Sequence, residues 1–396
     1  MNKIGNIENK NILLLQGPMG SFFKRLDKKF KKDGANTFRI GFNAGDAFFS
    51  FGSNYTPYRG TEEEWNDFIL NYLVENKINK IFLFGDCRFY QSIAIKSASN
   101  LNIDVYVFEE GYIRPHYITM EKHGVNDYSR ISRDTNFFKQ LPLKKIEKPL
   151  HANQSKTKMV LSAASYYLIS NLFNFRYPHY RHHRDFSARK ELFYGLRGVV
   201  RKLIYPFYEA KYLEEIENKL SKKYYFVPLQ THNDFQILEH SGYRSIEKFI
   251  IEVLESFSNN APKNRWLIFK HHPVDRGRKN YKNFIMQQAE LLGIENMILV
   301  LHDIHLPSCL EHAIGTVTIN STVGLSSVSQ GTPTITLGNA IYDIAGLTCR
   351  DMPLKDFWNY QQKPDMDLFE KYRTYLIETT QLNGSFYGNM PDFKSD

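Results

Sequence analysis

Short apolar runs alternate with helix-sized segments over the first third of the chain. Four runs are rich in aliphatic and aromatic side chains and end in Gly or Asp: 11–17, 37–46, 80–86 and 103–111. Between the second and third runs, the Glu- and Asn-rich stretch 61–77 is long enough for a helix. Short strands separated by helices are typical of βαβ units, so the pattern predicts a parallel sheet.

A second series of the same kind begins after residue 220. We expect strands in the runs 224–230, 266–273, 296–300 and 332–338, and a strand that leads through a small-residue turn into a helix at 316–328. Helices are expected near 245–257 and at 366–381. The second half of the chain therefore repeats the α/β rhythm, although no sequence repeat links the two halves.

The domain organisation follows from this rhythm. Residues 146–219 lack it and are helical in pattern, basic and Tyr-rich. The length of 396 residues exceeds what one hydrophobic core usually serves. The sequence predicts an α/β protein with Rossmann-like domains at 1–145 and 220–350, a helical bridging segment at 146–219, and a closing helix and tail at 351–396.

Charge and cysteine content narrow the class of protein. The formal net charge of +9 predicts an anionic partner: nucleic acid, anionic lipid, or a substrate with phosphate or carboxylate groups. Three cysteines without a CxxC pair argue against a disulfide framework or a thiolate zinc site and favour a reducing compartment. The first apolar run is too short for the core of a signal peptide, so we expect a cytoplasmic protein.

One segment leaves two structures open. Residues 159–175 contain no charged side chain and are followed by the basic, aromatic run 176–184. Ser, Asn and Tyr dilute the segment, which is at the lower limit of length for a membrane-spanning helix. It fits a buried or domain-bridging helix, or a helix that lies in the membrane interface with the basic run on lipid headgroups.

The predicted strands of the first half end in polar residues. Parallel sheets bind ligands at the carboxyl ends of their strands, which here are 16–20, 43–46, 85–88 and 109–114. Glu109 and Glu110 are adjacent, and neighbouring strand residues point to opposite faces. We therefore expect one of them to face a cleft as a base or nucleophile and the other to have a structural role. Acidic residues that favour the start of a helix are the structural alternative.

The second half offers an anion site. Pro273 keeps His272 extended at the end of a strand, with Lys270 and Arg276 close in sequence. Ser321 and Thr322 follow another strand at the expected start of a helix, where free N–H groups bind phosphate or are simply capped. The sequence contains no Walker loop, no GxGxxG, no HExxH and no DxD triplet of the kind that carries a nucleotide-bridging metal, so we expect metal-independent chemistry.

Taken in order, these strand ends resemble a known family. The segments QGPMGSFFKRL, FNAGDAFF, YRG, FGDCRFY, VFEEGYIRPHYITME, PLQTHND, FKHHPVDRG and NSTVGLSSVSQGTPTITLG match capsular polysaccharide biosynthesis proteins of KpsS/LipB type over most of 11–350. A fainter resemblance links the chain to bacterial sialyltransferases, which share a D/E-D/E-G motif and an HP motif. In this sequence those motifs are Glu109–Gly111 and His272–Pro273.

The resemblance implies a fold and an activity. The fold is GT-B-like, with two Rossmann-like domains facing a central cleft, the first on the acceptor side and the second binding the CMP-sugar. The activity is a retaining glycosyltransferase that moves β-Kdo (3-deoxy-D-manno-oct-2-ulosonic acid) from CMP-β-Kdo to lyso-phosphatidylglycerol, starting the poly-Kdo linker of a capsule. Implied partners are the inner face of the bacterial inner membrane, where the protein is peripheral, and other capsule biosynthesis and export proteins. No cofactor, metal or nucleic acid is implied.

The resemblance also assigns roles to residues. Glu110 is the expected nucleophile, with Asp46 or Asp86 as the base for the acceptor hydroxyl. The usual residue at the second acid is Asp, so Glu110 departs from the pattern by one methylene. His272 is expected to assist departure of the CMP phosphate. The expected donor-binding set is Gln230, Lys270, His272, Pro273, Asn320, Ser321 and Thr322, and the set for the Kdo carboxylate and the acceptor is Gly17, Arg59, Arg88, Glu109 and Arg114.

Two other functions stay open from the sequence. One is a non-catalytic component of capsule export or assembly, although such a protein has no need of both acidic and HP motifs. The other is a GT-B-like enzyme on a different nucleotide sugar, such as CMP-sialic acid or a UDP-sugar. The lysine-rich run 24–32, the run 176–184 and the uncharged segment 159–175 are the candidates for membrane contact.

Overall fold

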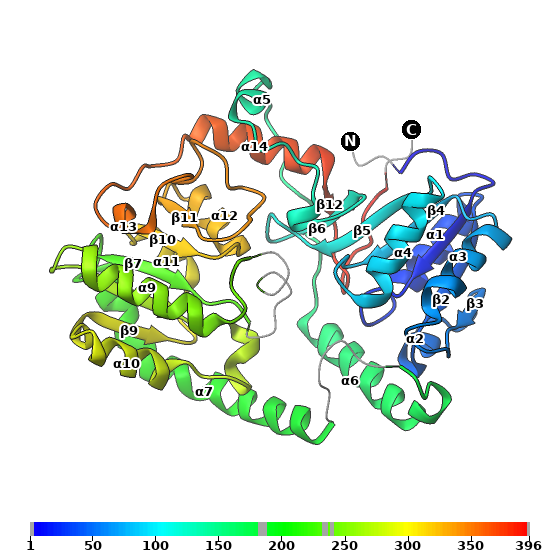
Figure 1. Ribbon diagram of the computed structural model, residues 1–396, viewed down its shortest axis with the longest axis horizontal. Helices are drawn as coiled ribbons and strands as arrows, with labels where there is room; N and C mark the ends of the chain where they lie inside the picture. The colour runs from blue at the N-terminus through cyan, green and yellow to red at the C-terminus, as the bar shows by residue number, and fades with distance from the viewer. Residues whose placement is uncertain (1–3, 181–187, 232–236, 238–240, 394–396) are drawn as a thin grey trace. The chain divides into compact units, whose positions relative to one another are not determined.

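The computed structural model describes residues 4–180, 188–231, 237 and 241–393 (Figure 1). The chain forms two compact units, each with its own sheet. The first contains residues 1–130, 145–188 and 374–396, and the second contains 131–144 and 189–373. The expected α/β class with two Rossmann-like units, as in GT-B-like proteins, is confirmed.

The first unit is built on a seven-stranded sheet in the order β12-β6-β5-β4-β1-β2-β3. Strands β1 to β5 are parallel, whereas β6 runs antiparallel to both β5 and β12. The strands are β1 (Asn11–Leu15), β2 (Asn36–Gly41), β3 (Tyr55–Pro57), β4 (Lys80–Phe84), β5 (Asp104–Glu110), β6 (Tyr117–Lys122) and β12 (Gln381–Asn383). The helices are α1 (Phe22–Lys32), α2 (Ala44–Phe48), α3 (Trp65–Glu75), α4 (Phe89–Asn100) and α6 (Lys156–Leu172).

Alternation along the strands produces two cores in this unit. On one face, Phe22, Phe23 and other side chains of α1 pack with Phe82 and Phe108. On the opposite face, α3 and α4 pack against Leu83 and its neighbours on the sheet. Because the central parallel strands are covered on both faces, their sequences are nearly continuous in apolar residues.

The second unit has a five-stranded parallel sheet in the order β11-β10-β7-β8-β9. Its strands are β7 (Tyr224–Pro228), β8 (Trp266–Lys270), β9 (Ile298–Leu301), β10 (Gly315–Thr318) and β11 (Thr334–Thr336). Its helices are α5 (Thr135–Gln140), α7 (Ala188–Glu217), α9 (Ile246–Asn260), α10 (Lys282–Leu291), α11 (Leu306–Glu311), α12 (Thr322–Ser329) and α13 (Leu354–Phe357). Helix α14 (Met366–Thr379) begins in this unit and ends in the first.

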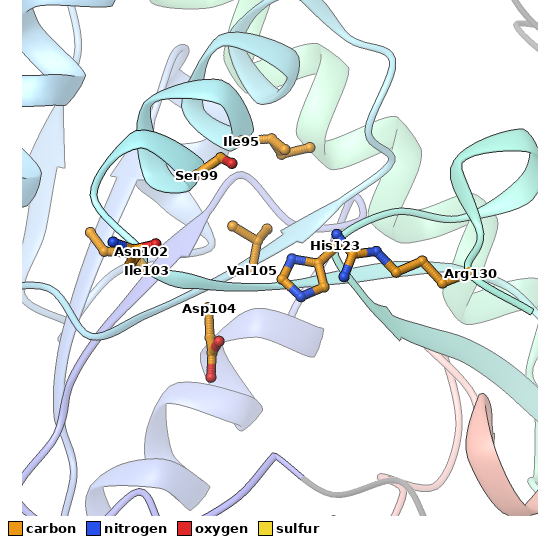
Figure 2. Close-up of a pocket in the computed structure, with 8 residues that line it drawn as sticks. All are labelled: Ile95, Ser99, Asn102, Ile103, Asp104, Val105, His123 and Arg130. Atoms are coloured by element: carbon orange, nitrogen blue, oxygen red, sulfur yellow. The ribbon is translucent and has the colours of Figure 1, made fainter.

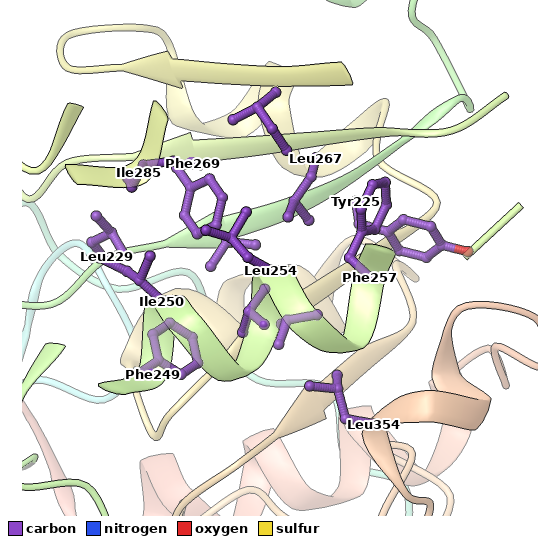
Figure 3. Close-up of a cluster of buried hydrophobic side chains, with 14 of the residues drawn as sticks. Tyr225, Leu229, Phe249, Ile250, Leu254, Phe257, Leu267, Phe269, Ile285 and Leu354 are labelled. Atoms are coloured by element: carbon purple, nitrogen blue, oxygen red, sulfur yellow. The ribbon is translucent and has the colours of Figure 1, made fainter. Parts of the chain in front are cut away.

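The larger core of the second unit lies between the sheet and α9. Figure 3 shows Phe249, Ile250, Leu254 and Phe257 of that helix directed at side chains of the sheet. The opposite face is covered by the end of α7 and by α11. Side chains of β8 therefore alternate between these two cores.

The structure differs from the sequence prediction in several elements. The run 37–46 is not one strand: β2 ends at Gly41, and Asn43 accepts a hydrogen bond from the N–H of Asp46 as the cap of α2. Strands β3, β6 and β12 were not predicted. Strands β3 and β12 are three-residue segments, which show no alternation of their own. The expected helix at 366–381 ends at Thr379, and Gln381 then pairs with Thr119 of β6.

The division into units also differs from the expected boundaries. Helix α6 belongs to the first unit and most of α7 to the second, so the segment 146–219 is shared between them. The tail after residue 374 adds a strand to the first sheet. Among the described residues, no helix combines the length and apolar character needed to cross a membrane. The basic run 176–184 is described only as far as residue 180.

Candidate active site

The carboxyl ends of β5, β4, β1 and β2 lie side by side along one edge of the first sheet. This order brings the predicted polar strand ends of the first half together within that unit. Two glutamates, Glu109 and Glu110, end β5, and their side chains point to opposite faces of the sheet.

Glu109 lies on the face covered by α4. Its carboxylate accepts a hydrogen bond of 2.9 Å from the N–H of Glu110, and the positive charge of Arg88 acts on it. Burial outweighs both effects and raises the pKa of Glu109 to about 7. A carboxyl group with such a pKa can gain or lose a proton near neutral pH.

Glu110 is exposed at the end of the strand, yet desolvation of its carboxyl group raises its pKa, and the charge of Arg114 offsets this only in part. Arg114 itself donates a hydrogen bond of 3.1 Å to the carbonyl of Gly111. A Cβ atom at Gly111 would lie 2.2 Å from the carbonyl oxygen of Tyr117, so the glycine allows β6 to return close to β5. The third residue of the EEG motif is thus structural, and Glu110 is the carboxylate that solvent reaches.

Asp46 belongs to a buried hydrogen-bond network. It accepts hydrogen bonds from the N–H of Phe42, from Gln16 and from the hydroxyl of Tyr166 on α6, at 2.8, 3.0 and 2.9 Å. Burial raises the pKa of Asp46 despite these donors. Gln91 extends the network by donating to Gln16. Asp46 therefore joins α6 to the ends of β1 and β2.

The other predicted site residues of the first unit are Asp86, Arg88, Arg59 and Gly17, and each has different contacts. Asp86 is buried and accepts a hydrogen bond of 2.8 Å from the N–H of Val125. The guanidinium of Arg88 lies 5.2 Å from the ring centre of Phe84, and that of exposed Arg59 lies 5.7 Å from the ring centre of Tyr177. A Cβ atom at Gly17 would lie 2.4 Å from the ring of Phe23, so that glycine permits tight packing of the loop on α1.

In the second unit, the two histidines after β8 have different roles. His271 is buried, and its Nε2 accepts a 2.7 Å hydrogen bond from the N–H of Tyr281. Burial lowers the pKa of His271 to about 3, so the ring is neutral. His272 is extended, as the following proline predicts, and its Nδ1 accepts from the N–H of Val274 at 3.2 Å. Because Nδ1 of His272 accepts this hydrogen bond, the proton of the ring is on Nε2.

The ends of β7 and β10 meet beside the end of β8 in this sheet. Gln230 donates a hydrogen bond of 3.0 Å to the side chain of Asn320, which ties the two strand ends together. Ser321 caps α12 by accepting from the N–H of Val323 at 3.2 Å, and Thr322 begins the helix. Three predicted donor-binding segments thus lie along one edge, with a helix N-terminus among them.

Lys270 has a more enclosed position than the sequence indicates. Its amine is buried and lies 3.4 Å from each of two carbonyl oxygens, those of His271 and His302. Burial lowers the pKa of Lys270. Since Lys270 alternates with Phe269, it points to the α7 side of the sheet.

The sequence prediction missed a group of residues on α7 that hold the loop 271–278. Arg197 donates hydrogen bonds to the carbonyls of Gly277 and Arg278, and Arg201 donates to the carbonyl of Arg276. Glu209 accepts from His302, which stacks on His271 with 4.3 Å between ring centres. Arg197, Arg201, Tyr205 and Glu209 recur every four residues along α7, so a helical stripe of polar residues was the available signal.

One pocket of about 360 Å³ lies elsewhere in the first unit. Figure 2 shows its lining, which includes Asp104 and Val105 at the amino end of β5 together with His123 and Arg130. It is therefore at the opposite end of the strand from Glu109 and Glu110. Within the described part of the chain, no three or more His, Cys, Asp or Glu side chains are grouped so as to hold a metal ion.

Comparison with known proteins gives the family. The family model described as "Capsule polysaccharide biosynthesis protein" matches residues 79–387. The chain belongs to this capsule polysaccharide biosynthesis family. It is 39% identical to the capsule polysaccharide export protein KpsS of Escherichia coli over 381 residues, covering 96% of this chain and 98% of that protein. The expected resemblance to proteins of KpsS/LipB type is confirmed.

Two further members of the comparison are more distant. The capsule polysaccharide modification protein LipB of Neisseria meningitidis serogroup A is 38% identical over 398 residues, covering 96% of this chain and 92% of that protein. A solved structure of the β-Kdo 2,7 transferase KpsC of Thermosulfurimonas dismutans aligns with 92% of this chain and 89% of its own, at 14% identity and a TM-score of 0.41. Membership of the family assigns this protein to capsule polysaccharide biosynthesis.

Proposed function

We propose that this protein is a retaining glycosyltransferase that moves Kdo from CMP-β-Kdo to a lyso-phosphatidylglycerol acceptor. The proposal is supported by the side chains at the carboxyl ends of the strands in the two sheets. One unit presents the exposed carboxylate of Glu110, and the other presents extended His272 beside the capped start of α12. An acid for the sugar and a phosphate site for the nucleotide are the two parts that such a transfer needs.

Retention requires two displacements at the anomeric carbon. In the first, a carboxylate oxygen of Glu110 forms a bond to that carbon while the bond to the CMP phosphate oxygen breaks. His272, with its proton on Nε2, donates a hydrogen bond to the departing phosphate, and Ser321 and Thr322 bind that phosphate at the start of α12. In the second, the acceptor oxygen replaces Glu110 and a base removes its proton.

Three carboxyl groups are candidates for that base. Asp46 and Asp86 accept hydrogen bonds from buried backbone N–H groups, so each already has a structural partner. Glu109 has a pKa of about 7 because of burial, which suits proton transfer near neutral pH. Arg59, Arg88 and Arg114 are candidates for the carboxylate of Kdo, since a guanidinium binds a carboxylate through two hydrogen bonds.

A lipid acceptor places the reaction at a membrane surface. In the first unit, α6 directs Tyr166 and Ser170 toward α2, where both take part in hydrogen bonds. Its outer side chains Val160, Leu161, Leu168 and Leu172 are exposed. The lysines of α1 and the residues that follow α6 add positive charge. We propose that these segments contact the inner face of the inner membrane, and that other capsule proteins act on the same lipid-linked product.

The deciding experiment uses purified protein with CMP-Kdo generated in situ and a fluorescent lyso-phosphatidylglycerol. We expect a product that carries Kdo and no product with CMP-sialic acid. Incubation with donor alone should add the mass of one Kdo to the intact protein, and Glu110→Gln should abolish that addition. An active enzyme that never shows the added mass contradicts the covalent step. Activity on CMP-sialic acid only, or binding of the lipid with no transfer of any sugar, contradicts the proposed function.

A further inference from the structure

Helix α7 has its polar and apolar faces reversed relative to an ordinary surface helix. The face toward the second unit carries Arg197, Arg201 and Glu209, each hydrogen-bonded to the loops after β8 and β9. The other face is apolar and exposed. A surface helix normally buries its apolar stripe and shows its charges to water, so this arrangement requires a separate explanation.

The exposed face is a continuous row of large side chains. Their exposed fractions run from 42% to 86%, and the residues are Phe193, Leu196, Val199, Val200, Leu203, Ile204, Phe207 and Tyr208. The spacing of three or four residues places them on one side of the helix. We call this row the outer α7 stripe. It is aliphatic and aromatic along about four turns of helix, which is unlike the scattered apolar residues of a normal surface.

The charged residues within the stretch of α7 that carries the stripe have one sign. Residues 192–208 contain Arg197, Arg201 and Lys202 and no Asp or Glu. Lys202 is exposed, and a long alkyl stem allows such an amine to stay at the polar level while apolar neighbours enter an apolar phase. The acidic residues of α7 nearest to this stretch are Glu191, which precedes it, and Glu209, which is buried on the opposite face. An apolar face flanked by an exposed lysine, with no acid between residues 192 and 208, is complementary to an anionic lipid surface.

We propose that the outer α7 stripe docks on an anionic lipid bilayer. This deepens the proposed function and rests on it only for the lipid nature of the acceptor. The opposite face of α7 holds the loop that carries His272, through Arg197 and Arg201. A bilayer on the outer face is therefore separated from that loop by about one helix diameter, roughly 10 Å. Docking of this helix thus sets the height of the nucleotide-sugar loop above the membrane.

The test measures flotation of the purified full chain with vesicles. Vesicles of phosphatidylglycerol and phosphatidylethanolamine are compared with vesicles of phosphatidylcholine. The variant is the double substitution Leu203→Glu and Phe207→Glu, whose side chains are 66% and 86% exposed. The matched control is Leu291→Glu and Tyr360→Glu, which are 80% and 71% exposed in the same unit. Equal circular dichroism and melting temperature confirm that all three proteins are folded.

We expect the wild type and the control to float with anionic vesicles. The stripe variant should bind these vesicles at least about tenfold more weakly. Equal flotation of the stripe variant overturns the proposal. So does equal binding of the wild type to phosphatidylcholine, or a wild-type dimer that the stripe variant converts to monomer, since a second copy would then be the occupant. Transfer to a short-chain, soluble lyso-phosphatidylglycerol is assayed in parallel. Its absence in the wild type contradicts the proposed function and leaves the flotation result valid.

Discussion

The carboxylate of Glu209 accepts hydrogen bonds from the N–H of His302 at 2.8 Å and from its Nδ1 at 3.0 Å. It also accepts from the N–H of Asp303 at 2.7 Å. One side chain of α7 thus occupies the donors at the carboxyl end of β9. Burial raises the pKa of Glu209, but the hydrogen bonds from His302 and Asp303 outweigh it, so the pKa of that carboxyl lies below its ordinary value.

Replacing Glu209 with Ala should therefore destabilise the second unit. Two backbone N–H groups lose their acceptor in a buried environment, which costs about 1–3 kcal/mol in the free energy of unfolding. Urea denaturation measures this, with Glu214→Ala, an exposed acid on the same helix, as the control. A loss no greater than that of the control contradicts a structural role for Glu209.

His272→Ala should leave the fold intact and reduce transfer. If His272 donates to the departing phosphate, we expect kcat to fall about 100-fold or more, as for other general acids. His271→Asn should have the opposite profile, because His271 is buried and accepts from the N–H of Tyr281. It should lower the melting temperature. His305→Ala, an exposed histidine of the same unit, is the control for His272. Unchanged kcat in His272→Ala would remove this residue from the mechanism.

Glu109 should make stability depend on pH. Burial raises its pKa to about 7 in the folded chain, above the ordinary value of 4.5. Its contribution to stability is thus fully present below pH 4.5 and is lost as the pH rises through about 7, because the folded state disfavours the charged form. Glu109→Gln should consequently gain melting temperature relative to the wild type between pH 5 and pH 8. Parallel melting curves across that interval contradict the raised pKa.

Two glycine-to-alanine substitutions should change the thermal stability in opposite directions. A Cβ atom at Gly277 would lie 2.0 Å from the carbonyl oxygen of Tyr194, so Gly277→Ala should push the loop away from α7 and lower the melting temperature. Gly195 lies in the same helix with nothing within 4 Å of an added Cβ. Gly195→Ala should raise stability by about 0.5–1 kcal/mol, since alanine is the better helix former. Thermal unfolding of both variants tests whether α7 and the loop pack this closely.

The local pattern of apolar and polar residues was sufficient to predict most strands of the two sheets. The continuous apolar runs at 80–86 and 224–230 became β4 and β7 because central parallel strands are covered on both faces. Strand β12 was missed because Gln381–Asn383 is polar at both ends and is a strand only through its pairing with β6. The tail therefore joined the first unit, which its position in the chain did not indicate.

For the candidate site, too, the sequence predicted some features and the structure alone showed the others. Residue type and position after a strand were enough to single out Glu109, Glu110, His272 and Ser321. They could not show that His271 is neutral and buried while His272 caps the next turn, because the two differ only in what surrounds them. The structure also placed Asp46 in a network with Tyr166, a residue distant in sequence.

The sequence by itself determined the periodicity of the strands, the fold class, the motifs at the strand ends and the family. Each of these depends on residues close together in the chain. The tertiary structure alone decided which carboxylate is buried, which helix holds the His272 loop, and that the apolar face of α7 is exposed. Those properties depend on the desolvation, hydrogen bonding and burial of groups that folding brings together from distant parts of the chain.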